Sequence, residues 1–118
     1  MNYNVYFTDT FLKCLKILKK KYRRAKDDLL EIIRQLETEP SIGNPIPGWK
    51  REIWKVRVAS SDIKRGKSDG FRVIYLWREQ EEDVYLLSVY FKGVKQDVTV
   101  KEIKNLLYKM ELESDKSA

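Results

Sequence analysis

Three short runs in the second half of the chain decide the fold: residues 51–59 read REIWKVRVA, residues 71–78 read FRVIYLWR, and residues 84–90 read VYLLSVY. Each run is rich in β-branched and aromatic residues and has the length of a strand. The acidic stretch 79–83 is a turn signal, so the last two runs are expected to form a hairpin. Together the three runs predict an antiparallel sheet.

A strand and two helices are predicted ahead of this sheet. Residues 3–7 alternate in the manner of a strand, and Thr8 or Asp9 can cap the helix that follows. A second amphipathic helix is predicted from about residue 25 to residue 38. Because only the short joint 23–24 separates the two helices, we expect them to form an antiparallel hairpin.

The remaining segments complete the expected order β-α-α-β-β-β-α. Residues 39–49 hold three prolines and two glycines, and this composition predicts a loop without regular structure. Thr99 and Glu102 have the spacing of a capping box, which predicts a C-terminal helix. We expect one α+β domain over residues 1–113, a helix hairpin packed on an antiparallel sheet, with a polar tail at 114–118.

Composition narrows the classes of function. The 118 residues carry a formal net charge of +6, which favours a polyanionic partner such as nucleic acid. The chain has no histidine and one cysteine, Cys14, so we expect no transition-metal site and no metal cofactor. No apolar run approaches the ~20 residues of a membrane span, and the N-terminus lacks the features of a signal peptide. These features predict a cytoplasmic protein without a membrane partner.

Basic residues interrupt the apolar pattern of the first two predicted strands of the sheet. Lys55 and Arg57 alternate with apolar neighbours, so they are expected side by side on one face of the sheet, about 7 Å apart. That spacing suits successive phosphates, although a solvated outer face is the alternative. Arg72 interrupts an apolar run and needs a phosphate, a carbonyl or a carboxylate. An internal ion pair with Glu52 is the alternative for Arg72.

Two further groups of residues add to this pattern. Tyr90 and Lys92 have the same parity in the third run and are expected to project to one side, where the tyrosine can stack on a base, carry a proton or simply pack at a rim. The glycine-containing stretch 60–70 can follow a phosphate backbone. Its cations, together with one beyond the third run, are the predicted RNA-binding residues: Lys64, Arg65, Lys67 and Lys95.

Residues 64–75 (KRGKSDGFRVIY), residues 86–92 (LLSVYFK) and the capped helix from Thr99 resemble the RelE/ParE superfamily of bacterial toxins, in its HigB-like or RelE-like branch. The similarity covers nearly the whole chain. It implies a ribosome-dependent endoribonuclease that cuts mRNA without a metal and is silenced by a cognate antitoxin. The positions matching the working basic residues of RelE are Lys55, Arg57, Arg72 and Lys92.

This chain departs from RelE at the position of the catalytic tyrosine, and its loop reads Ser-Asp-Gly at 68–70 where Ser-Gly-Gly is usual. The catalytic tyrosine of RelE corresponds to Val98 here, whereas HigB-like members carry a tyrosine where Tyr90 stands. In a 2′-hydroxyl transesterification, Arg72 is the expected phosphate clamp and Tyr90 or Lys55 the base. Lys92 or Arg57 would assist the leaving group, and the cationic field is expected to lower the pKa of a neighbouring tyrosine or lysine.

Two alternatives share this fold class. A ParE-like toxin would inhibit gyrase by binding, with no need for the four clustered basic residues. A non-catalytic basic RNA-binding module would explain Val98 and the missing histidines. Substitution of Arg72 by alanine separates the alternatives, because only the nuclease loses its toxicity while it still folds.

Overall fold

The computed structural model describes residues 2–63, 70–95 and 97–117 and has an α+β fold, as predicted. The elements follow in the order β1 (Asn4–Phe7), α1 (Asp9–Lys21), α2 (Ala25–Thr38), the 3-10 helix η1 (Pro40–Ile42), β2 (Asn44–Pro45), β3 (Ile53–Val58), β4 (Phe71–Arg78), β5 (Asp83–Phe91) and α3 (Val100–Ser117). In the part of the chain that the structure describes, no helix is long and apolar enough to cross a membrane.

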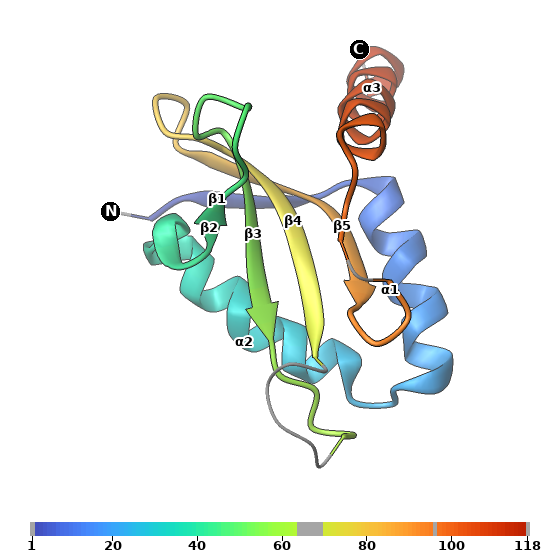
Figure 1. The fold of residues 1–118 in the computed structure, drawn as a ribbon. Helices are drawn as coiled ribbons and strands as arrows, with labels where there is room; N and C mark the ends of the chain where they lie inside the picture. The colour runs from blue at the N-terminus through green and yellow to red at the C-terminus, as the bar shows by residue number, and fades with distance from the viewer. Residues whose placement is uncertain (1, 64–69, 96, 118) are drawn as a thin grey trace.

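The strands form one sheet in the order β1-β5-β4-β3-β2. Strands β2 to β5 pair antiparallel as a meander, and β1 joins the edge parallel to β5. Helices α1 and α2 run across one face, whereas α3 lies beside the start of α1, where the Glu113 carboxylate accepts a hydrogen bond from the N–H of Asp9 (Figure 1). The helix hairpin and the β4–β5 hairpin are therefore confirmed.

Side-chain caps fix where two of the helices begin. The Thr8 hydroxyl oxygen accepts a hydrogen bond from the backbone N–H of Phe11 at 3.2 Å, and the same hydroxyl donates to the carbonyl of Leu86 at 2.8 Å. The start of α1 is thus tied to β5. At α3, the backbone N–H of Glu102 donates to the Thr99 hydroxyl at 3.1 Å, and the N–H of Thr99 donates to the Glu102 carboxylate at 3.2 Å. Both predicted caps are confirmed.

The prediction of a loop without regular structure over residues 39–49 was wrong, because this segment contains η1 and the two-residue strand β2. Pro45 lies opposite Trp54 in β2, at the edge of the sheet, where a residue without an N–H costs no ladder hydrogen bond. Helix α3 extends to Ser117 and so runs into the segment 114–118 that the sequence predicts to be a polar tail, because polar residues can continue a helix after its apolar stripe ends.

The sheet separates two apolar cores. The larger core lies under α1 and α2, and its members include Phe11, Leu29, Trp54, Val56, Val58, Val73 and Leu86. The smaller core lies on the opposite face under α3, and its members are Ile53, Ile74, Leu76, Leu87, Tyr90 and Ile103. The face that was expected to be an outer, solvated one is therefore covered at one end by α3. The other end of that face carries the basic residues.

Candidate functional site

Strand register brings three predicted residues into one row across the sheet. Arg57 of β3 lies opposite Arg72 of β4, and Arg72 lies opposite Tyr90 of β5. Lys55 lies two positions from Arg57 on the same face, opposite Ile74. The predicted alternation of β3 is confirmed, because Trp54, Val56 and Val58 enter the larger core while Arg57 is exposed.

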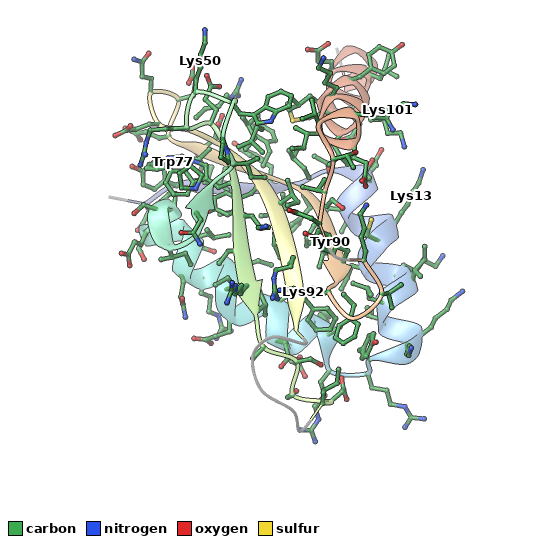
Figure 2. All side chains as sticks on the ribbon, viewed as in Figure 1. Lys13, Lys50, Trp77, Tyr90, Lys92 and Lys101 are labelled. Carbon is green, nitrogen blue, oxygen red and sulfur yellow. The ribbon has the colours of Figure 1, made fainter. Side chains whose placement is uncertain are left out.

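These residues surround a hollow of about 320 Å³, which we call the basic hollow. Four of the five predicted catalytic residues line it, namely Lys55, Arg57, Arg72 and Lys92. The rest of its wall comes from the β2 region and from the segment before α3, with Asn44, Pro45, Ile46, Pro47, Asp97 and Val98. Tyr90 and Lys92 project at the end of β5 in Figure 2. The hollow thus joins cations from strands β3 and β4 and from the turn that follows β5.

Arg72 lies at the floor of the basic hollow with only 3% of its surface exposed. Its Nη1 donates to the carbonyl of Phe71 at 3.0 Å. Burial and the nearby charge of Arg57 lower the pKa of Arg72 from its ordinary value, and the partial charge of Tyr90 opposes that effect. Two like charges directly opposite on adjacent strands destabilise a sheet, so this pair is a cost to the fold.

The structure rejects the alternative of an ion pair between Arg72 and Glu52. The backbone N–H of Trp77 donates to the carbonyl of Glu52 at 2.8 Å, which places Glu52 beside the far end of β4. Arg72 instead faces Arg57, five residues further along the chain from Glu52 and roughly 16 Å away at the strand repeat. The two side chains cannot span that separation.

Gly70 sets the start of β4 at this site. A β-carbon on Gly70 would lie 2.2 Å from the backbone oxygen of Val58, so any larger residue would push the two strands apart. The carbonyl of Gly70 also accepts a hydrogen bond from the N–H of Lys92 at 3.1 Å. Glycine therefore holds β3, β4 and the end of β5 together where Arg57, Arg72 and Lys92 project.

Asp97 lines the basic hollow, although it was not predicted from the sequence. Its Oδ1 accepts hydrogen bonds from the Lys55 ammonium at 3.2 Å and from the N–H of Val98 at 2.8 Å. Partial burial alone would raise the pKa of Asp97, but these hydrogen bonds and the charges of Lys55 and Lys92 bring it below its ordinary value. A signal was available, because Asp97 precedes the position at which the resemblance placed a catalytic tyrosine.

Tyr90 is nearly buried, with 9% of its surface exposed, and its hydroxyl has no hydrogen-bond partner among the described residues. Burial and the charge of Asp97 raise the pKa of Tyr90, while the charge of Arg72 lowers it less. The expectation that the cationic field lowers the pKa of a neighbouring tyrosine is therefore wrong here, since desolvation outweighs the field. A neutral phenol at this place can donate a proton more readily than accept one.

Of the four predicted RNA-binding residues, the structure describes one. Lys95 does not line the basic hollow: it forms an ion pair with Glu102 in the first turn of α3, and its Nζ lies 5.5 Å above the ring of Tyr90. The structure thus gives Lys95 a local structural role. The other three, Lys64, Arg65 and Lys67, lie outside the described residues.

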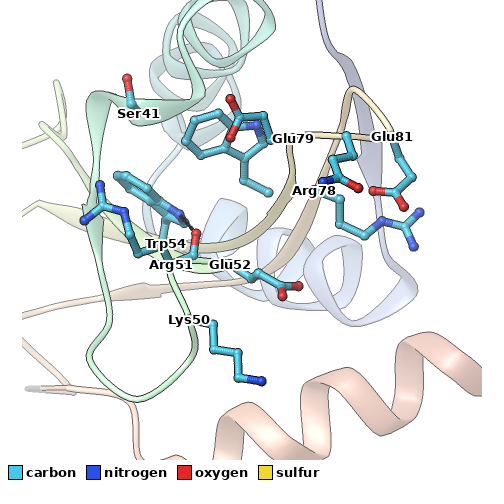
Figure 3. A pocket seen from close by; sticks show the side chains of 10 residues that line it. Ser41, Lys50, Arg51, Glu52, Trp54, Arg78, Glu79 and Glu81 are labelled. Atoms are coloured by element: carbon cyan, nitrogen blue, oxygen red, sulfur yellow. Dashed lines mark hydrogen bonds between the residues drawn. The ribbon is translucent and has the colours of Figure 1, made fainter.

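A larger hollow of about 650 Å³ lies at the opposite end of β3 and β4 (Figure 3). Its wall mixes both charges with two indoles: Lys50, Arg51 and Arg78 stand among Glu52, Glu79 and Glu81, and Trp54 donates through Nε1 to the carbonyl of Arg51 at 2.7 Å. None of the predicted site residues lies there. Within residues 2–63, 70–95 and 97–117, no three His, Cys, Asp or Glu side chains gather as a metal site would require.

Comparisons with known proteins bear on the family and the fold of the chain. A family model described as the ParE toxin of the type II toxin–antitoxin system parDE matches residues 5–90. A doubly substituted mutant of the E. coli toxin RelE in its free state has 18% sequence identity and a TM-score of 0.60, with 96% of this chain and 98% of that chain covered.

Two solved complexes are also similar. The first is the toxin–antitoxin complex RelBE2 from Mycobacterium tuberculosis, at 23% identity and TM-score 0.58, covering 77% of this chain and 99% of that one. The second is the archaeal RelE–RelB complex from Pyrococcus horikoshii OT3, at 24% identity and TM-score 0.50, covering 79% and 98%. These likenesses show that the chain has the RelE fold.

Proposed function

The chain belongs to the ParE toxin family of type II toxin–antitoxin systems, and on that premise we propose that it is a ribosome-dependent endoribonuclease that cuts mRNA without a metal ion. The observation that carries this proposal is the basic hollow. Lys55, Arg57, Arg72 and Lys92 line one space of about 320 Å³, which is enough room for a phosphodiester and part of a base. A toxin that acts by binding gyrase would not need this convergence.

The proposed reaction is attack of a ribose 2′-oxygen on the adjacent phosphorus. The P–O5′ bond breaks as the new P–O2′ bond forms, which yields a 2′,3′-cyclic phosphate and a 5′-hydroxyl end. Arg72 at the floor of the hollow would hold two phosphate oxygens, because a guanidinium binds them as a fork. Arg57 and Lys92 would stabilise the charge that develops on the pentacoordinate phosphorus.

Proton transfer falls to the remaining groups. Tyr90 does not line the basic hollow and its hydroxyl is buried, so Lys92, which the sequence predicts to assist the leaving group, would supply the proton to the departing 5′-oxygen. The base would come from the pair Lys55–Asp97, whose polar atoms lie 3.2 Å apart. Because its pKa lies below the ordinary value, the carboxylate of Asp97 is a weak base, and its proposed part is to orient Lys55, which the sequence predicts as a candidate base.

The partners follow from the same chemistry. None of the proposed proton-transfer groups is a histidine, so much of the rate would come from holding the substrate in line, and the ribosome can supply that positioning to an mRNA codon. A cognate antitoxin is the proposed protein partner, because two similar structures are toxin–antitoxin complexes. The protein would act in the cytoplasm, where translating ribosomes are found.

Inducible expression in a bacterium, followed by primer extension on an abundant mRNA, tests the nuclease. The expected result is a set of cuts within translated regions that disappears when translation is blocked and when Arg72 is replaced by alanine. Growth arrest that persists in the Arg72→Ala variant, without any cuts, would contradict the proposal. Circular dichroism of the variant controls for loss of folding.

Inhibition of gyrase is the second candidate function, and the match to the ParE family model favours it. Under this alternative the toxin acts by binding, and the basic hollow has no role in toxicity. A supercoiling assay with purified gyrase distinguishes the two, because a ribosome-dependent nuclease leaves supercoiling unchanged.

A non-catalytic RNA-binding module is the third candidate. It is favoured by Val98, which lines the hollow where RelE would carry a tyrosine, and it would bind RNA without cutting it.

A further inference from the structure

The basic hollow has a charged side and an uncharged side. The charged side holds its four cations and Asp97, whereas the uncharged side includes Asn44, Ile46 and Val98. A nucleotide is divided in the same way, because its phosphate is anionic while its base is neutral, with flat faces that stack and edges that form hydrogen bonds. The uncharged side therefore offers a place for a base beside the phosphate that we assign to Arg72.

Strand register places Asn44 on the same face as the cations. Asn44 lies opposite Lys55 in the antiparallel pair of β2 and β3. Residues that lie directly opposite project from the same face, with their β-carbons about 5 Å apart. Ile46 has the same parity as Asn44, and its N–H donates to the carbonyl of Ile53 at 2.8 Å, which continues the ladder. Asn44 and Ile46 thus form adjacent parts of one wall.

The segment that carries Asn44 is anchored to the middle of the sheet. A β-carbon on Gly43 would lie 2.6 Å from the backbone oxygen of Lys55 and 2.7 Å from the Tyr75 hydroxyl, so only glycine allows this close approach. The Tyr75 hydroxyl donates to the carbonyl of Pro40 at 2.5 Å and accepts from the N–H of Gly43 at 3.3 Å. Anchoring of this kind positions a recognition side chain more precisely than a free loop does.

The amide group of Asn44 is open to a ligand. Asn44 is exposed, and its side chain makes no hydrogen bond to any residue that the structure describes. An ordinary solvated residue at a sheet edge is the alternative, and Asn4 of β1 at the opposite edge is an example. Asn44 differs from Asn4 because it lines a hollow that also holds four cations.

The chemistry of an amide indicates which base it would recognise. A carboxamide carries a donor and an acceptor side by side. Adenine presents its N6 amino group next to the acceptor N7, and asparagine is a usual bidentate partner of this edge. Guanine presents two acceptors there, O6 and N7, so the amide oxygen would lose its partner. Ile46 and Val98 would supply apolar contact to the face of the base.

We propose that Asn44 is a specificity-determining residue whose amide recognises an adenine next to the phosphate at Arg72. This inference rests on the proposed function, because it requires mRNA in the basic hollow. Asn44 has no part in the proposed proton transfers. It would therefore set which codons are cut, while the cations determine how fast the phosphorus is attacked.

Single-turnover cleavage on ribosomes tests this proposal, with mRNAs that differ by one base in the A-site codon. At one codon position, the wild type should cut adenine-containing codons about 10-fold faster or more than the same codons with guanine. Asn44→Leu keeps the size of the side chain without its polar atoms, and should bring this ratio to within about twofold of one. Asn4→Leu is the matched control and should keep the wild-type ratio.

A second measurement separates recognition of the base from catalysis. Ribosomes carrying an A-site codon with 2′-deoxyriboses bind the protein but cannot be cut, because the attacking hydroxyl is absent. Replacement of the adenine by unsubstituted purine removes only the N6 amino group, and should weaken wild-type binding by about 5-fold or more. Binding of Asn44→Leu should change by less than about twofold. Melting curves of both variants control for folding.

The outcomes distinguish this inference from the proposed nuclease. An adenine preference that persists in Asn44→Leu, or that is absent from an active wild type, would overturn the role of Asn44 and leave the nuclease intact. Loss of all cleavage in a folded Asn44→Leu variant would place Asn44 in the catalytic machinery and would also overturn the inference. Discrimination between the 2′-deoxy codons without cleavage of any ribose codon would contradict the nuclease alone. A wild type that neither cuts nor binds programmed ribosomes would overturn both.

Discussion

The face of the sheet that carries α3 has two contrasting ends built from the same three strands. At the α3 end, Ile53, Leu76 and Leu87 pack beneath Ile103 and are almost fully buried. At the other end, Arg57 faces Arg72 directly and the wall is open to solvent. One end lowers the free energy of the folded state, whereas the other raises it.

This difference shows that the basic end of the face is not optimised for stability. Strands of this kind would be more stable with apolar pairs along their whole length, since burial of each large aliphatic side chain contributes about 1.5–3 kcal/mol. The basic end forgoes that contribution and adds repulsion between cations. Such a local violation of folding rules is typical of functional sites. Substitutions at the two ends should therefore have opposite effects on stability and activity.

The largest expected effect is on activity at the basic end. Arg72→Ala removes the proposed phosphate clamp and should lower the single-turnover rate of mRNA cleavage on programmed ribosomes by about 100-fold or more. Arg72→Lys keeps the charge but loses the fork geometry, so it should recover only part of the rate. Equal rates for wild type and Arg72→Ala would break the assignment of the basic end.

The next effect is on stability at the α3 end. Leu76→Ala leaves a cavity in the smaller core and should lower the free energy of unfolding by about 2–5 kcal/mol, as measured by urea denaturation. The cleavage rate per folded molecule should change little. A large loss of activity without loss of stability would show that the two ends are not separate in function.

A smaller effect of opposite sign is expected from Arg57→Gln. Removal of one cation from the pair with Arg72 should raise the free energy of unfolding by roughly 0.2–1 kcal/mol. The same change should weaken RNA binding and reduce the slope of log affinity against log salt by about 1. Stabilisation with unchanged RNA affinity would mean that Arg57 does not contact phosphate.

The smallest effect concerns Asp97 and pH. The pKa of Asp97 is lower in the folded state than in the unfolded state. The ionised carboxylate therefore stabilises the fold at pH values above the unfolded-state pKa, and this stabilisation is lost as the pH falls through the folded-state pKa. Denaturation of wild type and Asp97→Asn should therefore differ at about pH 6 and converge at about pH 2. A constant difference across this range would show that the ionised carboxylate does not stabilise the fold.

Much of the fold could be predicted from local signals. The β-branched and aromatic content of residues 71–78, the cap at Thr8 and the capping box at Thr99 are all short-range signals, and the strand and both caps are present in the structure. Strand β2 could not be foreseen in this way. It consists of Asn44 and Pro45, whose pairing depends on the distant β3 and not on their own propensity.

The basic residues of the site were predictable because parity in a strand decides which side chains share a face. Lys55, Arg57 and Lys92 were found in this way, and Arg72 was found because it interrupts an apolar run; the strand register then places Arg72 opposite Arg57. Asp97 was missed because it lies outside any periodic element. The direction of the pKa shift of Tyr90 was also out of reach, since it depends on burial that only the packed structure shows.

The most direct test of the central claim is cleavage of an end-labelled mRNA on purified ribosomes with an empty A site. We predict that the wild-type protein cuts within the A-site codon and leaves a 2′,3′-cyclic phosphate, and that it cuts free mRNA far more slowly. The Arg72→Ala variant should cut neither the ribosome-bound mRNA nor the free mRNA. An uncut mRNA, together with inhibition of gyrase supercoiling by the same preparation, would contradict the account and leave the basic hollow without a catalytic role.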